Sequence, residues 1–317
     1  MRAYVIRRLL LAIPTLWLAT LIVFFFIRLI PGDAIEMILA QQEITGGGMS
    51  IEEVQAELGL DQPIYIQYVR WLADILRGDF GNSLWMRTSV TAEILPRIPV
   101  SFELGLLAIS VGLIVAVPIG IYSAIRQDTI GDYVGRSIAI AFIAIPGFWI
   151  GTIVLVFPSI WWGWAPQMLY VRFSEDPLAN LRLVIIPAAI LGMVISGITM
   201  RMTRTMMLEV LRQDYIRTAW AKGIKERVVI LRHALKNALI PIVTIVGIQA
   251  PLLIGGSVVF EQMFNLPGVG RLLVFSLQRR DYPTLSAINI IVAAFVLIIN
   301  LIVDLTYAYL DPRIRYS

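Results

Sequence analysis

The chain of 317 residues contains no cysteine and a single histidine, His233. Without cysteine it can form no disulfide, no thiolate nucleophile and no cysteine-based metal site. One histidine is too few for the HExxH zinc motif and leaves no base for a conventional catalytic triad. No glycine precedes a lysine, so the phosphate-binding loop G-x-x-x-x-G-K-S/T is absent as well. We therefore expect no catalytic residue, no metal site and no bound cofactor, and the chain cannot itself be a P-loop ATPase.

Charged residues are also scarce, at 15% of the chain against 58% hydrophobic residues, and the mean hydropathy is +0.79. This composition is too apolar for an ordinary soluble domain. A helix crosses a membrane with about 20 mostly apolar residues, and six uncharged runs of that kind recur. The runs are 9–27, 104–125, 137–158, 183–200, 238–260 and 282–303. We predict an all-α integral membrane protein with six transmembrane helices.

The basic residues lie mostly on one side of these predicted spans. The segments 1–8, 126–136, 201–237 and 304–317 hold 16 of the 26 Lys and Arg residues but only 7 of the 22 Asp and Glu residues. Cytoplasmic loops carry such an excess of positive charge. We therefore expect both termini and the loop 201–237 to be cytoplasmic.

The first run has an alternative interpretation as a cleaved signal peptide, because Arg2, Arg7 and Arg8 precede it. The run is longer than the 7 to 15 residues of a signal h-region, and no small-x-small cleavage site precedes Arg28. We expect it to remain as a membrane anchor.

The predicted spans divide the chain into four parts. These are a cytoplasmic end with the first span (1–30), an extracytoplasmic segment (31–103), a five-helix transmembrane core that includes the loop 201–237 (104–310), and a cytoplasmic tail (311–317).

The extracytoplasmic segment is expected to be largely helical. A capping box of Ser50 and Glu53 opens a helix over 51–58. Helical spacing of apolar residues predicts a second helix that begins after Pro63 and ends at Gly78. Three glycines, 46–48, form a flexible tip.

Proline and glycine interrupt several spans, and we take Pro118, Pro146, Gly147 and Pro251 as hinge or pathway candidates. The alternative is that both residue types are simply more frequent in membrane helices. Gly147 and Gly151 have GxxxG spacing, which indicates helix packing within the chain or with another subunit. The tryptophans at 161, 162 and 164 are typical of an aromatic belt at the membrane surface rather than of a ligand-stacking site.

The loop 201–237 contains the only lysines, at 222, 225 and 236. Apolar residues at helical spacing form one stripe before Gly223 and a second stripe after it. The stripes are Leu208, Leu211, Tyr215 and Ala219, then Ile224, Val228, Leu231, Leu235 and Leu239. We predict a short helix, a sharp turn at Gly223, and a second helix that leads into the fifth span at Pro241. Such helices could lie on anionic lipid, or they could act as a lever for a soluble partner.

No ionisable group occurs inside the six runs, whereas ion-coupled transporters place such groups in their pathway. Arg28 and Asp304 lie only at the outer and inner membrane edges. His233 lies in the basic loop between Arg232 and Lys236, and we interpret it as a structural or interface residue rather than a proton relay. The energy for transport must then come from another protein.

Short motifs along nearly the whole chain resemble the permease subunits of binding-protein-dependent ABC importers, of the dipeptide and oligopeptide branch. The motifs are RLIPGD (28–33), ELGLDQP (57–63), GDFGNS (78–83), RMTRTMMLEVL (201–211), the loop from Asp214 to Gly223 with Pro241, PGVGR (267–271), RRDYP (279–283) and DPRIR (311–315). The general importer loop reads Glu-Ala-Ala-x-x-x-Gly. Here Arg217, Thr218, Ala219 and Gly223 stand at the matching positions, so the glutamate is missing.

The resemblance implies a type I ABC importer permease fold in a prokaryotic inner membrane. It implies a second homologous permease subunit, two ATP-binding subunits that hold ATP and magnesium, and an extracytoplasmic substrate-binding protein, but no nucleic acid. The residues that would dock on an ATP-binding subunit are Arg217, Thr218, Ala219, Lys222, Gly223, Ile224 and Lys225. The segment 31–99 would contact the binding protein or the partner permease.

The function implied by the resemblance is half of an ATP-driven import pathway, with peptides as the favoured cargo. The same branch also carries nickel complexes, glutathione and oligosaccharides. A self-sufficient channel or carrier and a membrane enzyme remain as alternatives from other classes.

Overall fold

The computed structural model describes residues 2–29, 61–165 and 169–310. Within these ranges the chain is helical, with only an isolated bridge between Asn82 and Ser89. The helices are α1 (Arg2–Leu29), α4 (Ile64–Leu76), α5 (Val90–Ile94), α6 (Ile98–Ile125), α7 (Ile130–Ala144), α8 (Gly147–Trp162), α9 (Pro177–Leu211), α10 (Asp214–Ala221), α11 (Glu226–Val228), the π-helical turn η1 (Val229–Ala234), α12 (Leu235–Met263), α13 (Val269–Gln278) and α14 (Tyr282–Leu310). The predicted helix 51–58 and the glycine tip 46–48 lie outside the described residues.

The predicted six spans are confirmed. In the described part, five stretches are long and apolar enough to cross a membrane, and the bent pair of α7 and α8 makes a sixth. The five stretches are Ile6–Phe26, Val90–Ile125, Pro177–Leu211, Glu226–Pro251 and Tyr282–Thr306.

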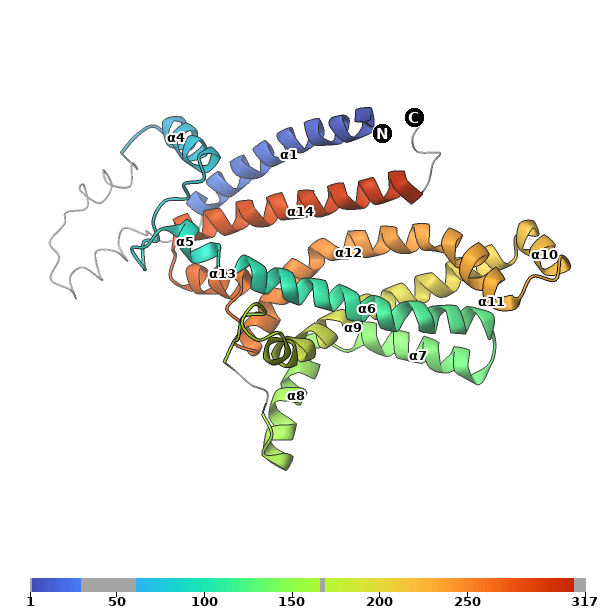
Figure 1. Ribbon diagram of the computed structural model, residues 1–317. Helices are drawn as coiled ribbons and strands as arrows, with labels where there is room; N and C mark the ends of the chain where they lie inside the picture. Colours follow the sequence, from blue (N-terminus) through green and yellow to red (C-terminus); the bar gives the residue numbers. More distant parts are fainter. Residues whose placement is uncertain (1, 30–60, 166–168, 311–317) are drawn as a thin grey trace.

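The third span differs from the single run predicted over 137–158. Its two helices meet at a bend of 90°. Proline lacks an N–H group and disfavours helical backbone in the residue before it, and Ile145 and Pro146 both take extended backbone angles. The proline therefore divides this span into two helices rather than kinking one, and Figure 1 shows α8 projecting from the side of the bundle.

Helices α6 and α9 form the centre of the bundle, where small residues let their backbones approach closely. A side chain at Gly192 would lie 2.5 Å from the Ala108 carbonyl oxygen, and one at Gly120 would lie 2.6 Å from the Thr203 Cβ. The Ser196 hydroxyl donates a hydrogen bond of 3.1 Å to the Gly112 carbonyl across the same interface.

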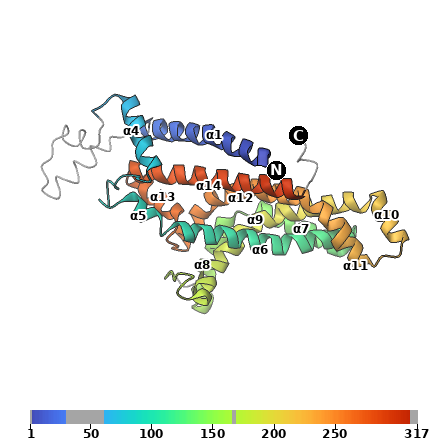
Figure 2. The same ribbon diagram turned by 45° about the horizontal axis from the view of Figure 1, so that its top comes forward.

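The first and last spans lie side by side along one flank of the bundle in both views (Figures 1 and 2). An ion pair of 3.1 Å joins Arg8 of α1 to Asp304 of α14. At the other end of α1, the buried Phe24 packs against Tyr68 and Trp71 of α4. The helix predicted after Pro63 is confirmed as α4, and it ends before Gly78, whose φ is +81°.

Candidate functional site: the loop between α9 and α12

Helix α9 is longer than a membrane crossing requires. Its 35 residues span about 52 Å at 1.5 Å per residue, whereas the hydrocarbon core is about 30 Å thick. The helix therefore continues beyond the membrane before α10 begins at Asp214. Figures 1 and 2 show α10 and α11 at one end of the bundle, and α4, α5 and α13 at the opposite end.

The turn after α10 depends on Gly223. Its φ of +71° lies in the left-handed region, which costs glycine least. Two hydrogen bonds close the end of the helix, from Gly223 N to Trp220 O at 2.9 Å and from Ile224 N to Ala219 O at 3.3 Å. This pattern is that of a Schellman cap, so the predicted sharp turn at Gly223 is confirmed.

The inner side of α10 is packed against both neighbouring spans. Ile216 and Ala219 are buried with Met207 of α9 and with Val229 and Ala234 of η1. The amide of Asn237 also donates a hydrogen bond of 2.8 Å to the Tyr215 hydroxyl. Helix α10 is therefore held both against α9, by apolar packing, and against the start of α12, by this hydrogen bond.

The first apolar stripe predicted in this loop was wrong as one helical face. Helix α9 ends at Leu211 and α10 starts at Asp214, so Leu208 and Leu211 lie on a different helix from Tyr215 and Ala219. The residue that α10 buries beside Ala219 is Ile216, while Tyr215 is largely exposed.

The second stripe was only partly right, because Ile224 and Leu235 do pack against the buried cluster of the loop. The buried residues are Val229, Ile230, Ala234 and Ala238, whereas Val228 and Leu231 are exposed. A π-helical turn has more residues per turn than an α-helix. The turn η1 therefore shifts the buried face away from the positions that a 3.6-residue period predicts.

The seven residues predicted to dock on a partner divide into two groups. Ala219 is buried and Ile224 is half-buried, so both hold α10 in place. The other five are exposed, and they are Arg217, Thr218, Lys222, Gly223 and Lys225. Trp220 is exposed among them and was not predicted. The outer surface of the loop is thus basic with one indole ring.

The hinge candidates occupy different kinds of position. Pro118 and Pro251 lie inside the continuous helices α6 and α12, whereas Pro146 lies in the 90° bend and Gly147 is the first residue of α8 after it. A side chain at Gly147 would lie 3.2 Å from the Phe260 ring, and one at Gly151 would lie 3.0 Å from the Met263 methyl group. This GxxxG pair therefore serves packing within the chain.

A buried ion pair near the start of the loop was not predicted. The guanidinium of Arg204 donates from Nε and Nη2 to the two carboxylate oxygens of Asp132, both at 2.7 Å. Asp132 is fully buried and also accepts a hydrogen bond from the Ser123 hydroxyl. The pair joins α7 to α9 and, through Ser123, to α6. From the sequence, Asp132 and Arg204 were only two of the charged residues in the predicted cytoplasmic segments. Nothing in their spacing indicates that they pair.

A second buried carboxylate, Glu261, explains the motif 267–271. It accepts hydrogen bonds from the Ser101 hydroxyl at 2.7 Å and from Arg271 N at 2.9 Å. A side chain at Gly268 would overlap the Glu261 carboxylate. The glycine makes room for this carboxylate at the N-terminus of α13, where the helix dipole favours negative charge.

A tyrosine of the connection between α8 and α9 is bonded to a third carboxylate. The Tyr170 hydroxyl donates to Glu103 Oε2 at 3.4 Å. Burial, together with the neighbouring Glu103 carboxylate, raises the pKa of Tyr170 to about 12. Tyr170 therefore stays a neutral hydrogen-bond donor at physiological pH.

Comparison with known proteins places these features in a family. Residues 116–316 match the binding-protein-dependent transport system inner membrane component, and residues 1–105 match the N-terminal component of the same membrane proteins. A putative peptide transport system permease protein of Brucella abortus (strain 2308) is 39% identical over 320 residues and covers 100% of both chains.

Two further relatives have different cargoes in their names. The dipeptide transport system permease protein of Escherichia coli (strain K12) is 37% identical over 343 residues and 100% of both chains. The glutathione transport system permease protein of Pectobacterium atrosepticum is 38% identical over 314 residues and 99% of both chains. These relatives confirm the resemblance to the dipeptide and oligopeptide branch.

A solved structure shows the same fold. The MetNI methionine ABC transporter, in an inward-facing conformation, matches with a TM-score of 0.53 at 15% identity, over 69% of this chain and 96% of that chain. The predicted importer permease fold is thereby confirmed. The chain belongs to the family of binding-protein-dependent transport system inner membrane components, and it is a multi-pass permease subunit of an ABC importer.

Proposed function

We propose that this permease forms half of an import pathway for short peptides and that ATP-binding subunits drive it through the exposed side of α10 and the Gly223 turn. The complete importer would contain a second homologous permease, two ATP-binding subunits that hold ATP and magnesium, and an extracytoplasmic binding protein that delivers the cargo. Both termini would be cytoplasmic.

One observation supports the lever more than any other: the apolar side of α10 is already occupied within the chain. Ile216 and Ala219 are buried against η1 and α9. A helix that lies on lipid needs a free apolar face, whereas the outward side of α10 presents Arg217, Lys222 and Trp220. This arrangement favours a protein partner over the lipid surface.

The same packing supports transmission of force. Helix α10 packs with Met207 of α9 and with Ala234 of η1, which leads directly into α12. A partner that moves α10 would therefore move both spans together. Because α9 packs closely on α6, the movement would continue into the centre of the bundle.

The variant Gly223→Arg tests the lever. Nothing lies within 4 Å of a side chain at Gly223, so arginine would project from the surface and block docking. We expect peptide uptake and uptake-coupled ATP hydrolysis by the complete importer to fall roughly tenfold or more, as for the loss of a central interface contact. The amount of folded protein in the membrane should stay the same as for Gly163→Arg.

Gly163→Arg is the matched control. Gly163 has a similar φ of +63° and ends α8, and a side chain added there would also meet nothing within 4 Å. Both variants carry the same backbone penalty of about 1–2 kcal/mol, but Gly163 lies far from α10. Uptake that survives Gly223→Arg, or that falls equally in both variants, would exclude the proposed lever.

The peptide cargo rests on the relatives named for peptides and dipeptides, and glutathione is itself a tripeptide. Uptake of a labelled dipeptide in cells that carry the whole importer, with the unlabelled dipeptide, glutathione, a nickel complex and an oligosaccharide as separate competitors, tests the cargo. Competition by the dipeptide alone supports peptides. Flux through this chain alone in liposomes would instead indicate a self-sufficient channel or carrier.

A further inference from the structure

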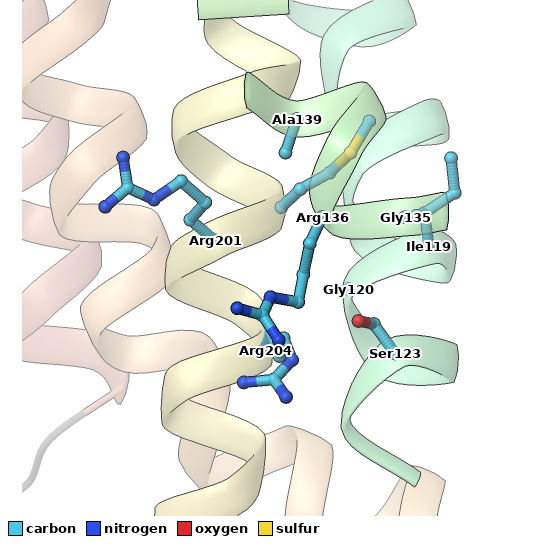
Figure 3. Close-up of a pocket in the computed structure, with 9 residues that line it drawn as sticks. Ile119, Gly120, Ser123, Gly135, Arg136, Ala139, Arg201 and Arg204 are labelled. Carbon is cyan, nitrogen blue, oxygen red and sulfur yellow. The ribbon is translucent and has the colours of Figure 1, made fainter. Parts of the chain in front are cut away.

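A pocket lies at the cytoplasmic ends of α6, α7 and α9, apart from the loop described above. Its empty volume, including solvent at the mouth, is about 220 Å³, and its lining residues are Ile119, Gly120, Ser123, Gly135, Arg136, Ala139, Met200, Arg201 and Arg204. Figure 3 shows the lining residues on the three helices, with the side chains of Arg136 and Arg204 between them. The enclosed part of this space is only about 20 Å³, enough for one water molecule, so a ligand would lie at the open mouth, which suits a small polar group rather than a whole peptide.

Two arginines give the pocket an excess of positive charge. In Figure 3 the side chain of Arg136 extends toward Arg204, while Arg201 leaves α9 on the other side. Arg204 bonds Asp132 through Nε and Nη2, which leaves the two N–H groups of Nη1 without a carboxylate. In the described part of the chain, Arg136 forms no ion pair, and its guanidinium lies 5.7 Å from the Tyr133 ring centroid. Of these two arginines only Arg204 is thus bonded to the carboxylate of Asp132, and within the described residues the charge of the Arg136 guanidinium is not neutralised by an ion pair.

The part of the pocket toward the membrane core is apolar, with Ile119, Ala139 and Met200, each about one helical turn from Ser123, Arg136 and Arg204. Met200 ends the apolar run 183–200, and Arg136 directly precedes the run 137–158. The pocket therefore lies at the level where the membrane core gives way to cytoplasm. A site with basic donors at its mouth and an apolar floor, between helices on the cytoplasmic side, matches the headgroup region of an anionic lipid.

We propose that this pocket binds the phosphate of an anionic phospholipid of the cytoplasmic leaflet. Arg136 and Nη1 of Arg204 donate hydrogen bonds to the phosphate oxygens, a geometry in which guanidinium is the preferred partner. Ile119 and Met200 contact the start of the acyl chains. We expect a lipid with net negative charge to bind better than a zwitterionic lipid. The cationic amine of a zwitterionic headgroup would be repelled by the two guanidinium groups and would cancel the negative charge of the phosphate.

The bound phosphate would add a bridge between α7 and α9 beside the Asp132–Arg204 pair. These two helices meet where α9 leaves the membrane toward α10. The lipid would thus stabilise the same joint that the proposed lever moves, although the binding site itself does not depend on that lever.

The test measures lipid binding to the complete importer, purified and placed in nanodiscs of phosphatidylcholine with or without phosphatidylglycerol. Native mass spectrometry counts the phosphatidylglycerol that each complex retains, and the midpoint of thermal unfolding gives a second reading. We expect Arg136→Gln to weaken retention roughly tenfold, the usual effect of losing a hydrogen bond to a charged group. Arg136→Lys should retain part of the binding.

Arg126→Gln is the matched control, because Arg126 is equally exposed at the end of α6 but does not line the pocket. It should leave retention unchanged. Equal losses in Arg136→Gln and Arg126→Gln, or no loss in either, would overturn the proposal. Glycerol 1-phosphate, which has the headgroup phosphate without acyl chains, should neither displace the lipid nor raise the unfolding midpoint. If it does both, the pocket is a site for free phosphate and the lipid assignment is wrong.

Discussion

Ser83 donates a hydrogen bond to Asp281 across 198 positions of the sequence. Asp281 is buried just before α14, and it also accepts from Leu84 N at 3.1 Å and from the Thr284 hydroxyl at 2.8 Å. The motif 78–83 thus contacts the motif 279–283. The contact holds the described part of the segment 31–103 on the last span, and it connects the regions matched by the two family models.

The change Asp281→Ala should destabilise this contact. It leaves the donors of Ser83, Leu84 and Thr284 without their acceptor, at about 1–3 kcal/mol for each buried unsatisfied group. We expect a lower midpoint of thermal unfolding in detergent and faster proteolysis near residue 83. Asp74→Ala is the control, since its carboxylate is half exposed in a surface ion pair, and equal effects of the two changes would contradict this role of Asp281.

The change Gly268→Ala should be costly although it adds only a methyl group. The new Cβ would overlap the buried Glu261 carboxylate, and overpacking of this kind typically costs about 1–3 kcal/mol. Gly105→Ala, which meets nothing within 4 Å, is the control. We expect the thermal midpoint to fall for Gly268→Ala alone. An unchanged midpoint of thermal unfolding would show that close packing of the N-terminus of α13 against the Glu261 carboxylate does not contribute to stability.

The six spans and α4 could be predicted because each depends on the composition or spacing of a single stretch. The buried face of the loop could not, because η1 departs from the period on which such a prediction rests. The pairing of Asp132 with Arg204 was equally inaccessible, since the two lie 72 positions apart and each lies in a segment rich in ordinary charges. The proline at 146 marked an interruption, but the angle of 90° between α7 and α8 could not be predicted from the proline alone, because Gly147 and Gly151 of α8 pack against the distant residues Phe260 and Met263.

Breaking the Asp132–Arg204 pair from one side should be more harmful than replacing both partners. Arg204→Met leaves a buried carboxylate without its cation, which costs about 3–5 kcal/mol. In the double variant Asp132→Asn with Arg204→Met no charge remains, and most of the stability should return. The thermal midpoints of the two single variants and the double variant form the cycle that measures this coupling. A double variant as unstable as the sum of both single variants would argue against the pair.

The absence of cysteine allows a direct test of the proposed topology. Each new cysteine would be the only thiol in the chain. Arg7→Cys and Lys225→Cys should react with a membrane-impermeant maleimide only after the cells are permeabilised, because both positions are exposed on the proposed cytoplasmic side. Ser174→Cys, between α8 and α9, should react once the reagent reaches the outer face of the inner membrane. Reaction of Arg7→Cys under that condition would exclude a cytoplasmic N-terminus.

Reversal of one charge on the outer side of the loop should weaken coupling without changing the fold. Lys222 directly follows α10 and precedes Gly223, and its side chain is exposed. The change Lys222→Glu therefore alters the surface that we propose for docking. We expect the association of the ATP-binding subunits to weaken roughly tenfold, or by about 1.4 kcal/mol. Lys236→Glu is the control, because it makes the same change of net charge in the same loop but lies on α12 outside the docking residues. Co-purification of the subunits at increasing salt measures both variants. If Lys236→Glu weakens association as much as Lys222→Glu, the loop attracts its partner only through its overall charge, and the specific surface around Gly223 is wrong.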